Sequence, residues 1–228
     1  MPTFIKAIIF DLDGVIIDSN PAIEAFWKSW AEREKLPLND TLIREWIHGR
    51  KVADTLYGIF GSLSETRKEE IAASAHIFDQ TMKPLALPGL VEFVGKLTVS
   101  GIPIGIVTSS HYDRMWQMLA NIGIARNFNY FITAHDVLKG KPDPEPYLKM
   151  SEKMQIEPAH CLVFEDANSG IQSATAAGMH SIGIGDDTAI PALKKWGADF
   201  VVNNFENLSI SNGLLQIQEQ PYYQLTSF

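Results

Sequence analysis

Short apolar runs, each followed at once by polar residues, recur along the chain and constrain its fold most strongly. They occupy residues 4–10, 102–107, 130–133, 161–164, 180–184 and 199–202. Stretches of helix length with apolar residues at helical spacing lie between them, at residues 90–99, 113–122, 144–154 and 169–177. Strands that alternate with helices in this way are joined by crossover connections. The pattern therefore predicts an α/β fold with a mostly parallel sheet that carries helices on both faces.

Residues 20–83 interrupt this alternation with helical periodicity and no convincing strand. Their apolar stripes are Ile23, Phe26, Trp27 and Trp30, then Leu42, Ile43, Trp46 and Ile47, then Val52, Leu56 and Phe60, then Ile71, Ala75 and Phe78. Such stripes are typical of packing faces. We therefore predict an inserted domain of four helices at residues 18–85, and a core domain made of residues 1–17 and 86–228. The last stretch, residues 208–228, is not assigned to an element.

The composition argues against several classes of protein. With 228 residues, 46% of them hydrophobic, the chain can bury a sizeable core, and its single cysteine allows no intrachain disulfide. A formal net charge of −8 does not suit nucleic acid binding, which needs a basic face. No apolar run reaches the ~18 residues of a membrane span, and the first ten residues lack a signal-peptide pattern. We expect a cytoplasmic protein with no nucleic acid or membrane partner, either a monomer or a weak homodimer.

The polar residues that follow the predicted strands share a chemistry. Because an open parallel sheet binds its ligand outside the carboxyl ends of its strands, these residues should converge. They are Asp11 and Asp13 after the first strand, Thr108 and Ser109 after the second, Glu165 and Asp166 after the fourth, and Lys139 and Lys141 in the loop before residues 144–154. Hard oxygen ligands in this arrangement suit Mg²⁺, which binds carboxylates, water and phosphate oxygens. The sequence therefore predicts a site for Mg²⁺ and a phosphate ester.

The Asp-x-Asp spacing suits phosphoryl transfer, since residues two apart on an extended chain point the same way. Asp11 can attack phosphorus once a metal and a lysine reduce the repulsion from the phosphoryl oxygens. Asp13 can protonate the leaving oxygen and then activate water. Thr108 and Ser109 can donate hydrogen bonds to phosphate oxygens, and Lys141 supplies a positive charge.

Four motifs of the chain resemble, in order, those of the haloacid dehalogenase-like superfamily. They are Asp11-Leu-Asp-Gly-Val15, Val107-Thr-Ser109, Lys139-Gly-Lys-Pro-Asp-Pro-Glu-Pro-Tyr147 and Phe164-Glu-Asp-Ala-Asn-Ser-Gly-Ile171. The helical insertion after the first motif is similar to the cap of that superfamily. The resemblance implies a Rossmann-like core, with an aspartyl-phosphate intermediate on Asp11 and acid/base work by Asp13. It further implies Mg²⁺ held by Asp11, the backbone carbonyl of Asp13 and Asp166, with Glu165 close by, and a phosphoryl group held by Thr108 and Lys141. Lys141 fits the third motif better than Lys139 because it directly precedes Pro142.

One segment of the insertion is a candidate for substrate contact. It is His48-Gly49-Arg50-Lys51, which resembles the His-Gly element in the caps of sugar and polyol phosphate phosphatases of the superfamily. We predict that these four residues, together with Ser109, bind substrate. The alternative interpretation is that residues 48–51 form a solvent-exposed helix end with no role in binding.

Three further residues receive structural interpretations. Asp18 and Ser19 are expected to cap the first helix of the insertion, which has Pro21 in its first turn. Cys161 opens a predicted buried strand and is expected to act as a small hydrophobic residue.

Positions 13 and 23 select among the chemistries of the superfamily. A dehalogenase or a phosphonate hydrolase of this superfamily lacks the second aspartate, so Asp13 argues against both. A phosphomutase resembling β-phosphoglucomutase carries a histidine in the cap linker where this chain has Ile23. We therefore predict a Mg²⁺-dependent phosphatase that hydrolyses a small phosphomonoester, a sugar or polyol phosphate. The alternatives are a sugar phosphomutase and a non-catalytic sensor of a phosphorylated ligand.

Overall fold

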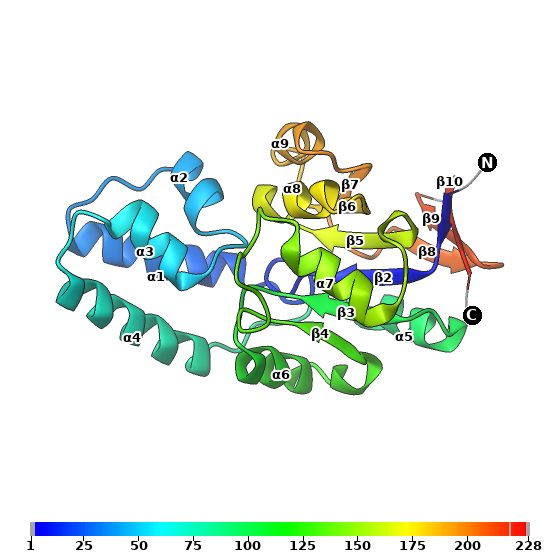
Figure 1. The fold of residues 1–228 in the computed structure, drawn as a ribbon, viewed down its shortest axis with the longest axis horizontal. Coiled ribbons are helices and arrows are strands. Elements are labelled where there is room, and N and C mark those ends of the chain that lie inside the picture. The colour runs from blue at the N-terminus through cyan, green and yellow to red at the C-terminus, as the bar shows by residue number, and fades with distance from the viewer. Residues whose placement is uncertain (1–2, 219, 227–228) are drawn as a thin grey trace.

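A six-stranded parallel sheet forms the centre of the molecule (Figure 1). The structure is a computed structural model that describes residues 3–218 and 220–226. The sheet has the order β4-β3-β2-β5-β6-β7, and every neighbouring pair is parallel. The strands are β2 (Ala7–Phe10), β3 (Ile104–Val107), β4 (Tyr130–Ile132), β5 (Cys161–Glu165), β6 (His180–Ile184) and β7 (Phe200–Val202). The predicted α/β fold is confirmed, and the strand order changes direction between β2 and β5, where such sheets bind ligands.

Helices cover both faces of the sheet because each strand contributes alternate residues to two apolar clusters. In β2, Ile8 and Phe10 belong to a cluster that includes residues of α5 and α6, whereas Ala7 and Ile9 belong to a cluster that includes residues of α7 and α8. The helices of this part are α5 (Leu90–Ser100), α6 (Tyr112–Asn121), α7 (Glu145–Met154), α8 (Asn168–Ala176) and α9 (Ile190–Lys195), with short 3₁₀ turns at Ala125–Asn127 and Pro158–His160. This packing fixes the carboxyl ends of the strands, from which the site is built.

Residues 20–81, which we call the helical insertion, form a separate group of helices at one end of the molecule (Figure 1). They are α1 (Asn20–Arg33), α2 (Asp40–Trp46), α3 (Val52–Phe60) and α4 (Glu65–Thr81). Their buried apolar residues, among them Trp27 and Phe60, make a cluster of their own. The chain leaves and returns along paired segments, where Ile17 bridges Ala86 and the Asp18 N–H donates to the Leu85 carbonyl at 2.9 Å.

The first strand and the tail differ from the sequence-based expectation. The single strand predicted at residues 4–10 is divided, because β1 (Thr3–Ile5) belongs to a second sheet of order β1-β10-β9-β8. The unassigned tail supplies β8 (Leu208–Ser211), β9 (Leu214–Ile217) and β10 (Gln220–Leu225), with Asn212 and Gly213 in the positive-φ turn that a tight hairpin requires. Leu215 and Tyr223 join the main apolar cluster, so the described part of the tail packs against the core.

Candidate active site

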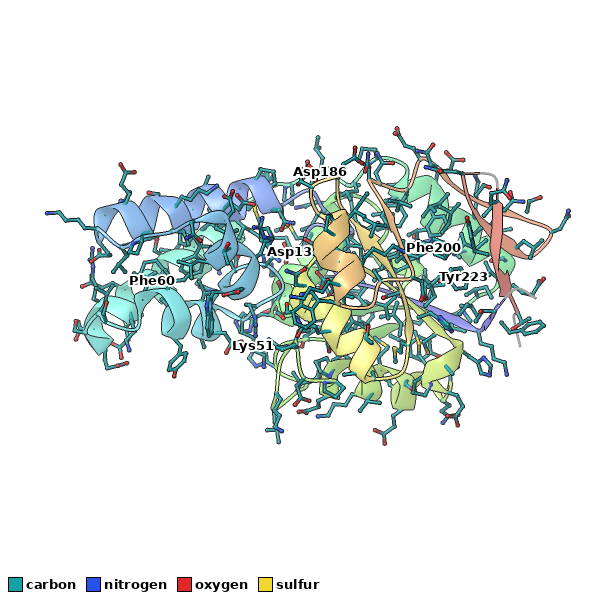
Figure 2. All side chains as sticks on the ribbon, turned by 90° about the horizontal axis from the view of Figure 1, so that it is seen from above. Asp13, Lys51, Phe60, Asp186, Phe200 and Tyr223 are labelled. Atoms are coloured by element: carbon teal, nitrogen blue, oxygen red, sulfur yellow. The ribbon has the colours of Figure 1, made fainter. Side chains whose placement is uncertain are left out.

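A cavity of about 300 Å³ lies between the helical insertion and the carboxyl ends of the strands. Its lining includes the predicted site residues Asp11, Asp13, Thr108, Ser109, His48, Gly49, Arg50 and Lys51. Figure 2 shows Asp13 and Lys51 where the insertion meets the sheet, whereas Phe60 lies within the insertion and Tyr223 near the opposite end of the molecule. Residues from both parts of the chain therefore face one cavity.

A buried lysine joins the carboxylates of two neighbouring strands. Asp11 directly follows β2 and Glu165 ends β5, and Nζ of Lys141 lies 2.7 Å from Asp11 Oδ1 and 2.5 Å from Glu165 Oε1. Lys141 also donates to the Val107 carbonyl at 3.1 Å, and the Tyr147 hydroxyl donates to Glu165 Oε1 at 3.0 Å. The three charged side chains are at most 4% exposed, so they depend on one another for charge compensation.

The surroundings of Asp11 disfavour its charged form. Burial raises the pKa of Asp11 to about 7, and the negative charge of Glu165 adds to the rise, although Lys141 lowers it. The same two carboxylates raise the pKa of the Lys141 ammonium against the opposing effect of its burial. Lys139 is largely exposed and pairs with Asp143, so Lys141 is the lysine of this loop that reaches Asp11.

The third carboxylate of the cluster leaves an acceptor oxygen unused. Asp166 Oδ2 accepts a hydrogen bond from Asn20 Nδ2 at 2.6 Å, while Oδ1 is buried and has no hydrogen-bond partner among the described residues. Burial, followed by the negative charges of Glu165 and Asp11, raises the pKa of Asp166 well above its ordinary value.

This cluster fits a divalent cation. Asp11, Glu165 and Asp166 each offer a carboxylate oxygen, and these oxygens lie within 4.8 Å of one another. Two buried carboxylates and the half-buried Asp166 face the single positive charge of Lys141, so a hard cation with oxygen ligands would balance them. Gly14 permits the Asp166 carboxylate to lie close to the backbone that follows β2. The φ of Gly14 is +73°, and a Cβ at this position would lie 2.2 Å from Asp166 Oδ2.

Asp13 lies in a different electrostatic environment from Asp11. Arg114 on α6 donates from Nη1 to Oδ2 and from Nη2 to Oδ1, both at 2.7 Å. Ser19 donates to Oδ1 at 2.6 Å and Ser110 to Oδ2 at 3.2 Å. Although burial alone would raise it, Arg114 and these hydroxyls hold the pKa of Asp13 below its ordinary value.

Ser19 does not serve as the predicted helix cap. It occupies the N-cap position of α1, but its side chain makes no capping hydrogen bond and donates to Asp13 instead. The charged carboxylate is the stronger acceptor available to this hydroxyl.

The two residues predicted to donate hydrogen bonds to phosphate already make hydrogen bonds within the protein. Thr108 follows β3, and its Oγ1 accepts a hydrogen bond from the Ser110 N–H at 3.1 Å. The Ser109 hydroxyl donates to the Gly49 carbonyl at 2.9 Å, so this side chain links the core to the insertion.

The loop between α2 and α3 is docked on the core. Arg50 Nη1 donates to the Lys141 carbonyl at 3.1 Å, and Lys51 Nζ donates to the Ala134 carbonyl at 3.0 Å. His48 lies 3.1 Å from Glu24, a residue of α1, and its own carbonyl accepts from Ser169 at 3.2 Å. The side chains of the predicted substrate-binding segment therefore contact the protein itself, although all four residues line the cavity.

Sequence reasoning missed Arg114 and Asp79. Nε of Arg114 lies 3.0 Å from Asp79 on α4, so this guanidinium contacts both the core and the insertion. A signal was present, because Arg114 falls on the buried face of α6 with Met115 and Met118, where an arginine is rare unless it is paired. Its partners are distant in sequence and could not be identified from the helix alone.

Comparison with known proteins agrees with this geometry, which defines an α/β enzyme with an acidic site at the carboxyl ends of its strands. A family model described as "Haloacid dehalogenase-like hydrolase" matches residues 8–184. The chain is 33% identical over 225 residues to "Hexitol phosphatase A" of Escherichia coli (strain K12), with 93% of this chain and 99% of that protein covered. It is 32% identical to "Glycerol-1-phosphate phosphohydrolase 2" of Saccharomyces cerevisiae, with coverage of 90% and 85%.

A crystal structure of β-phosphoglucomutase from Clostridium difficile superimposes with a TM-score of 0.76 and 26% identity, covering 90% of this chain and 94% of that one. The chain belongs to the haloacid dehalogenase-like hydrolase family. Among the described residues, no helix is long and apolar enough to cross a membrane.

Proposed function

We propose that the protein is a Mg²⁺-dependent phosphatase that hydrolyses a small sugar or polyol phosphomonoester through an aspartyl-phosphate on Asp11. The observation that carries the proposal is the cluster of Asp11, Lys141, Glu165 and Asp166, of which the first three are buried and Asp11 faces the cavity. The similarity to proteins named as hexitol and glycerol phosphate phosphatases supports the class of substrate.

Asp11 is the nucleophile, and its neighbours prepare it for attack. Lys141 contacts Asp11 at 2.7 Å and offsets negative charge near an incoming phosphoryl group. Glu165 holds Lys141 from the other side at 2.5 Å. Mg²⁺, held by Asp11, Asp166 and the carbonyl of Asp13 with Glu165 beside it, would neutralise phosphoryl oxygens and favour the anionic form of Asp11.

Asp13 is the acid/base residue of the proposed reaction. In the first step Asp11 forms a bond to phosphorus while the bond to the ester oxygen breaks, and Asp13 gives that oxygen a proton. In the second step Asp13 takes a proton from water, and the water oxygen displaces Asp11 from phosphorus. The products are an alcohol and inorganic phosphate.

The helical insertion acts as a cap, and we propose that the cap domain as a whole spans residues 18–85. Its contacts through Gly49, Arg50 and Lys51 hold it on the core beside the cavity, which would limit the access of bulk water during the first step. A volume of about 300 Å³ suits a small ester. Cytoplasmic location and a monomeric or weakly dimeric state stay predictions.

Hydrolysis is favoured over mutase chemistry by one residue of the cavity. Ile23 lines it at the position where the mutases of this family are expected to carry a histidine, and an isoleucine cannot exchange protons with a sugar hydroxyl. The phosphoryl group on Asp11 is therefore expected to pass to water.

The test is a panel of sugar, polyol and nucleoside monophosphates with Mg²⁺, scored for free phosphate and for isomerised product. We expect steady phosphate release that requires Mg²⁺ and is lost in Asp11→Asn but kept in Asp187→Asn, a control at an exposed aspartate. Beryllium fluoride should form an adduct on Asp11. Isomerised product without net phosphate would establish the mutase, and binding without turnover would establish the sensor.

A further inference from the structure

The carboxylate of Asp166 is held by one hydrogen bond among the described residues. Its Oδ2 accepts from Asn20 Nδ2 at 2.6 Å, whereas its Oδ1 is buried and has no hydrogen-bond partner there. Lys141 pairs instead with the other two carboxylates of the cluster, Asp11 and Glu165. The direction in which Asp166 points therefore depends on Asn20.

Two features of the surroundings would turn Asp166 away from the cluster without this contact. A carboxylate oxygen of Asp166 lies within 4.8 Å of one from Asp11 and one from Glu165, and like charges at such distances repel one another. Asp166 is also half-buried, and it lines a second cavity of about 690 Å³, whose described lining includes neither Asp11 nor Glu165. A carboxylate turned into that cavity would gain solvation and lose repulsion.

The backbone that follows β2 brings Asn20 to this point. Asn20 is the first residue of α1, and the segment before it is closed by the Gly14 N–H, which donates to the Ile17 carbonyl at 2.8 Å. A Cβ at position 14 would lie 2.3 Å from Asn20 Nδ2 and 2.2 Å from Asp166 Oδ2. The amide and the carboxylate therefore meet in space that any other residue at position 14 would occupy.

We propose that Asn20 is a positioning residue for the cation site, which holds the Asp166 carboxylate beside those of Asp11 and Glu165 and leaves Oδ1 free for the cation. The inference rests on the proposed role of Asp166 as a ligand of Mg²⁺. Removal of a hydrogen bond that orients a metal ligand typically weakens metal binding by about 10- to 100-fold. The rival role for Asn20 is contact with the ester, because it also lines the cavity that Asp11 faces.

The experiment measures Mg²⁺ binding to the whole protein by isothermal titration calorimetry, with no ester present, in the parent protein, Asn20→Ala and Asn203→Ala. In Asn20→Ala the Kd for Mg²⁺ should rise about 10- to 100-fold, because Asp166 is then free to turn into the second cavity. Asn203→Ala is the matched control, since Asn203 lines the same cavity but is not the hydrogen-bond donor to Asp166. It should keep the Kd of the parent protein.

Kinetics separate this role from contact with the ester. In Asn20→Ala the Mg²⁺ concentration that gives half-maximal phosphate release should rise in step with the Kd, whereas kcat and the KM for a polyol phosphate at saturating Mg²⁺ should change less than about threefold. A raised KM for the ester with an unchanged Kd for Mg²⁺ would make Asn20 a substrate contact and overturn the inference. If Asn20→Ala does not fold, Asn20→Ser, whose shorter side chain falls short of Asp166, decides by the same measurements.

Failure of this inference is separable from failure of the proposed function. Mg²⁺-dependent phosphate release by the parent protein, with the same Kd for Mg²⁺ in Asn20→Ala, would overturn only the role of Asn20. A fall in Tm of Asn20→Ala that is equal with and without Mg²⁺, at an unchanged Kd, would assign Asn20 to the stability of the fold and overturn the same inference. Absence of Mg²⁺-dependent turnover in the parent protein would overturn the proposed function as well.

Discussion

Replacement of Gly170 by alanine should disrupt the buried contacts of Glu165. Gly170 lies in the first turn of α8, and a Cβ there would lie 1.8 Å from Glu165 Oε1, whereas real Cβ atoms essentially never come within 3.0 Å of another atom. Glu165 would have to move by at least about 1.2 Å, which breaks its contacts with Lys141 at 2.5 Å and Tyr147 at 3.0 Å. Breaking a buried ion pair costs about 3–5 kcal/mol. The better helix propensity of alanine returns at most about 1 kcal/mol, so the net loss is about 2–4 kcal/mol.

Urea unfolding and thermal melting measure this loss, and Gly95→Ala is the matched control. Gly95 lies within α5, and a Cβ there would meet no atom within 4 Å. Gly95→Ala should therefore be neutral or stabilising by up to about 1 kcal/mol, whereas Gly170→Ala should lower Tm by about 5–15 °C. Phosphate release should fall in Gly170→Ala alone, because Lys141 loses its second carboxylate. Equal unfolding free energies for the two variants would refute the reasoning that Glu165 is held in place by the absence of a side chain at position 170.

Three further predictions concern the metal, the thiol and the docked loop. The pKa of Asp11 is raised from 3.8 to about 7, so the folded metal-free protein keeps a proton that the unfolded chain releases. Its free energy of unfolding should therefore fall as pH rises from about 4 to about 7. Mg²⁺ should raise Tm more at about pH 7.5 than at about pH 5, because the metal and the proton compete for Asp11. Equal rises in the two buffers would argue against metal binding at Asp11. Burial raises the pKa of the Cys161 thiol to about 12, so Ellman's reagent at about pH 8 should react only as the protein unfolds, and rapid reaction of native protein would contradict this. Gly49→Ala should lower kcat/KM about tenfold, because its Cβ would lie 2.7 Å from Ser169 Oγ; Gly123→Ala, with the same left-handed backbone but no atom within 4 Å, should lower stability without that kinetic loss, and matching kinetic losses would exclude a role for docking.

The strand ends could be predicted from the sequence because they depend on local patterns. An apolar run that stops at Asp11 or at Glu165 marks both the end of a strand and a residue at the ligand-binding edge of the sheet. Lys141 needed the neighbouring proline of its motif to be preferred over Lys139.

The rest depended on contacts between distant segments. The division between β1 and β2 could not be predicted, because residues 4–10 form one apolar run and only the pairing of β1 with β10 separates them. The sequence predicts a local helix cap at Ser19, whereas its hydroxyl donates to Asp13, six residues away, which is the stronger acceptor. Arg114 pairs with Asp13, in the loop that follows β2, and with Asp79 on α4. The helical periodicity of α6 carries no information about either partner.

The two aspartates of the first motif lie in surroundings that oppose their proposed roles. Burial and Glu165 raise the pKa of Asp11, whereas Arg114 lowers that of Asp13, which would make Asp11 the acid and Asp13 the anion. A divalent cation at the carboxylate cluster would favour the anionic form of Asp11, which the attack on phosphorus needs. The double contact of Arg114 with Asp13 favours a carboxylate that can take a proton from water, as the second step of the proposed reaction needs. The metal therefore has to be bound before the first step, because without it the buried Asp11 holds the proton that attack requires it to lose.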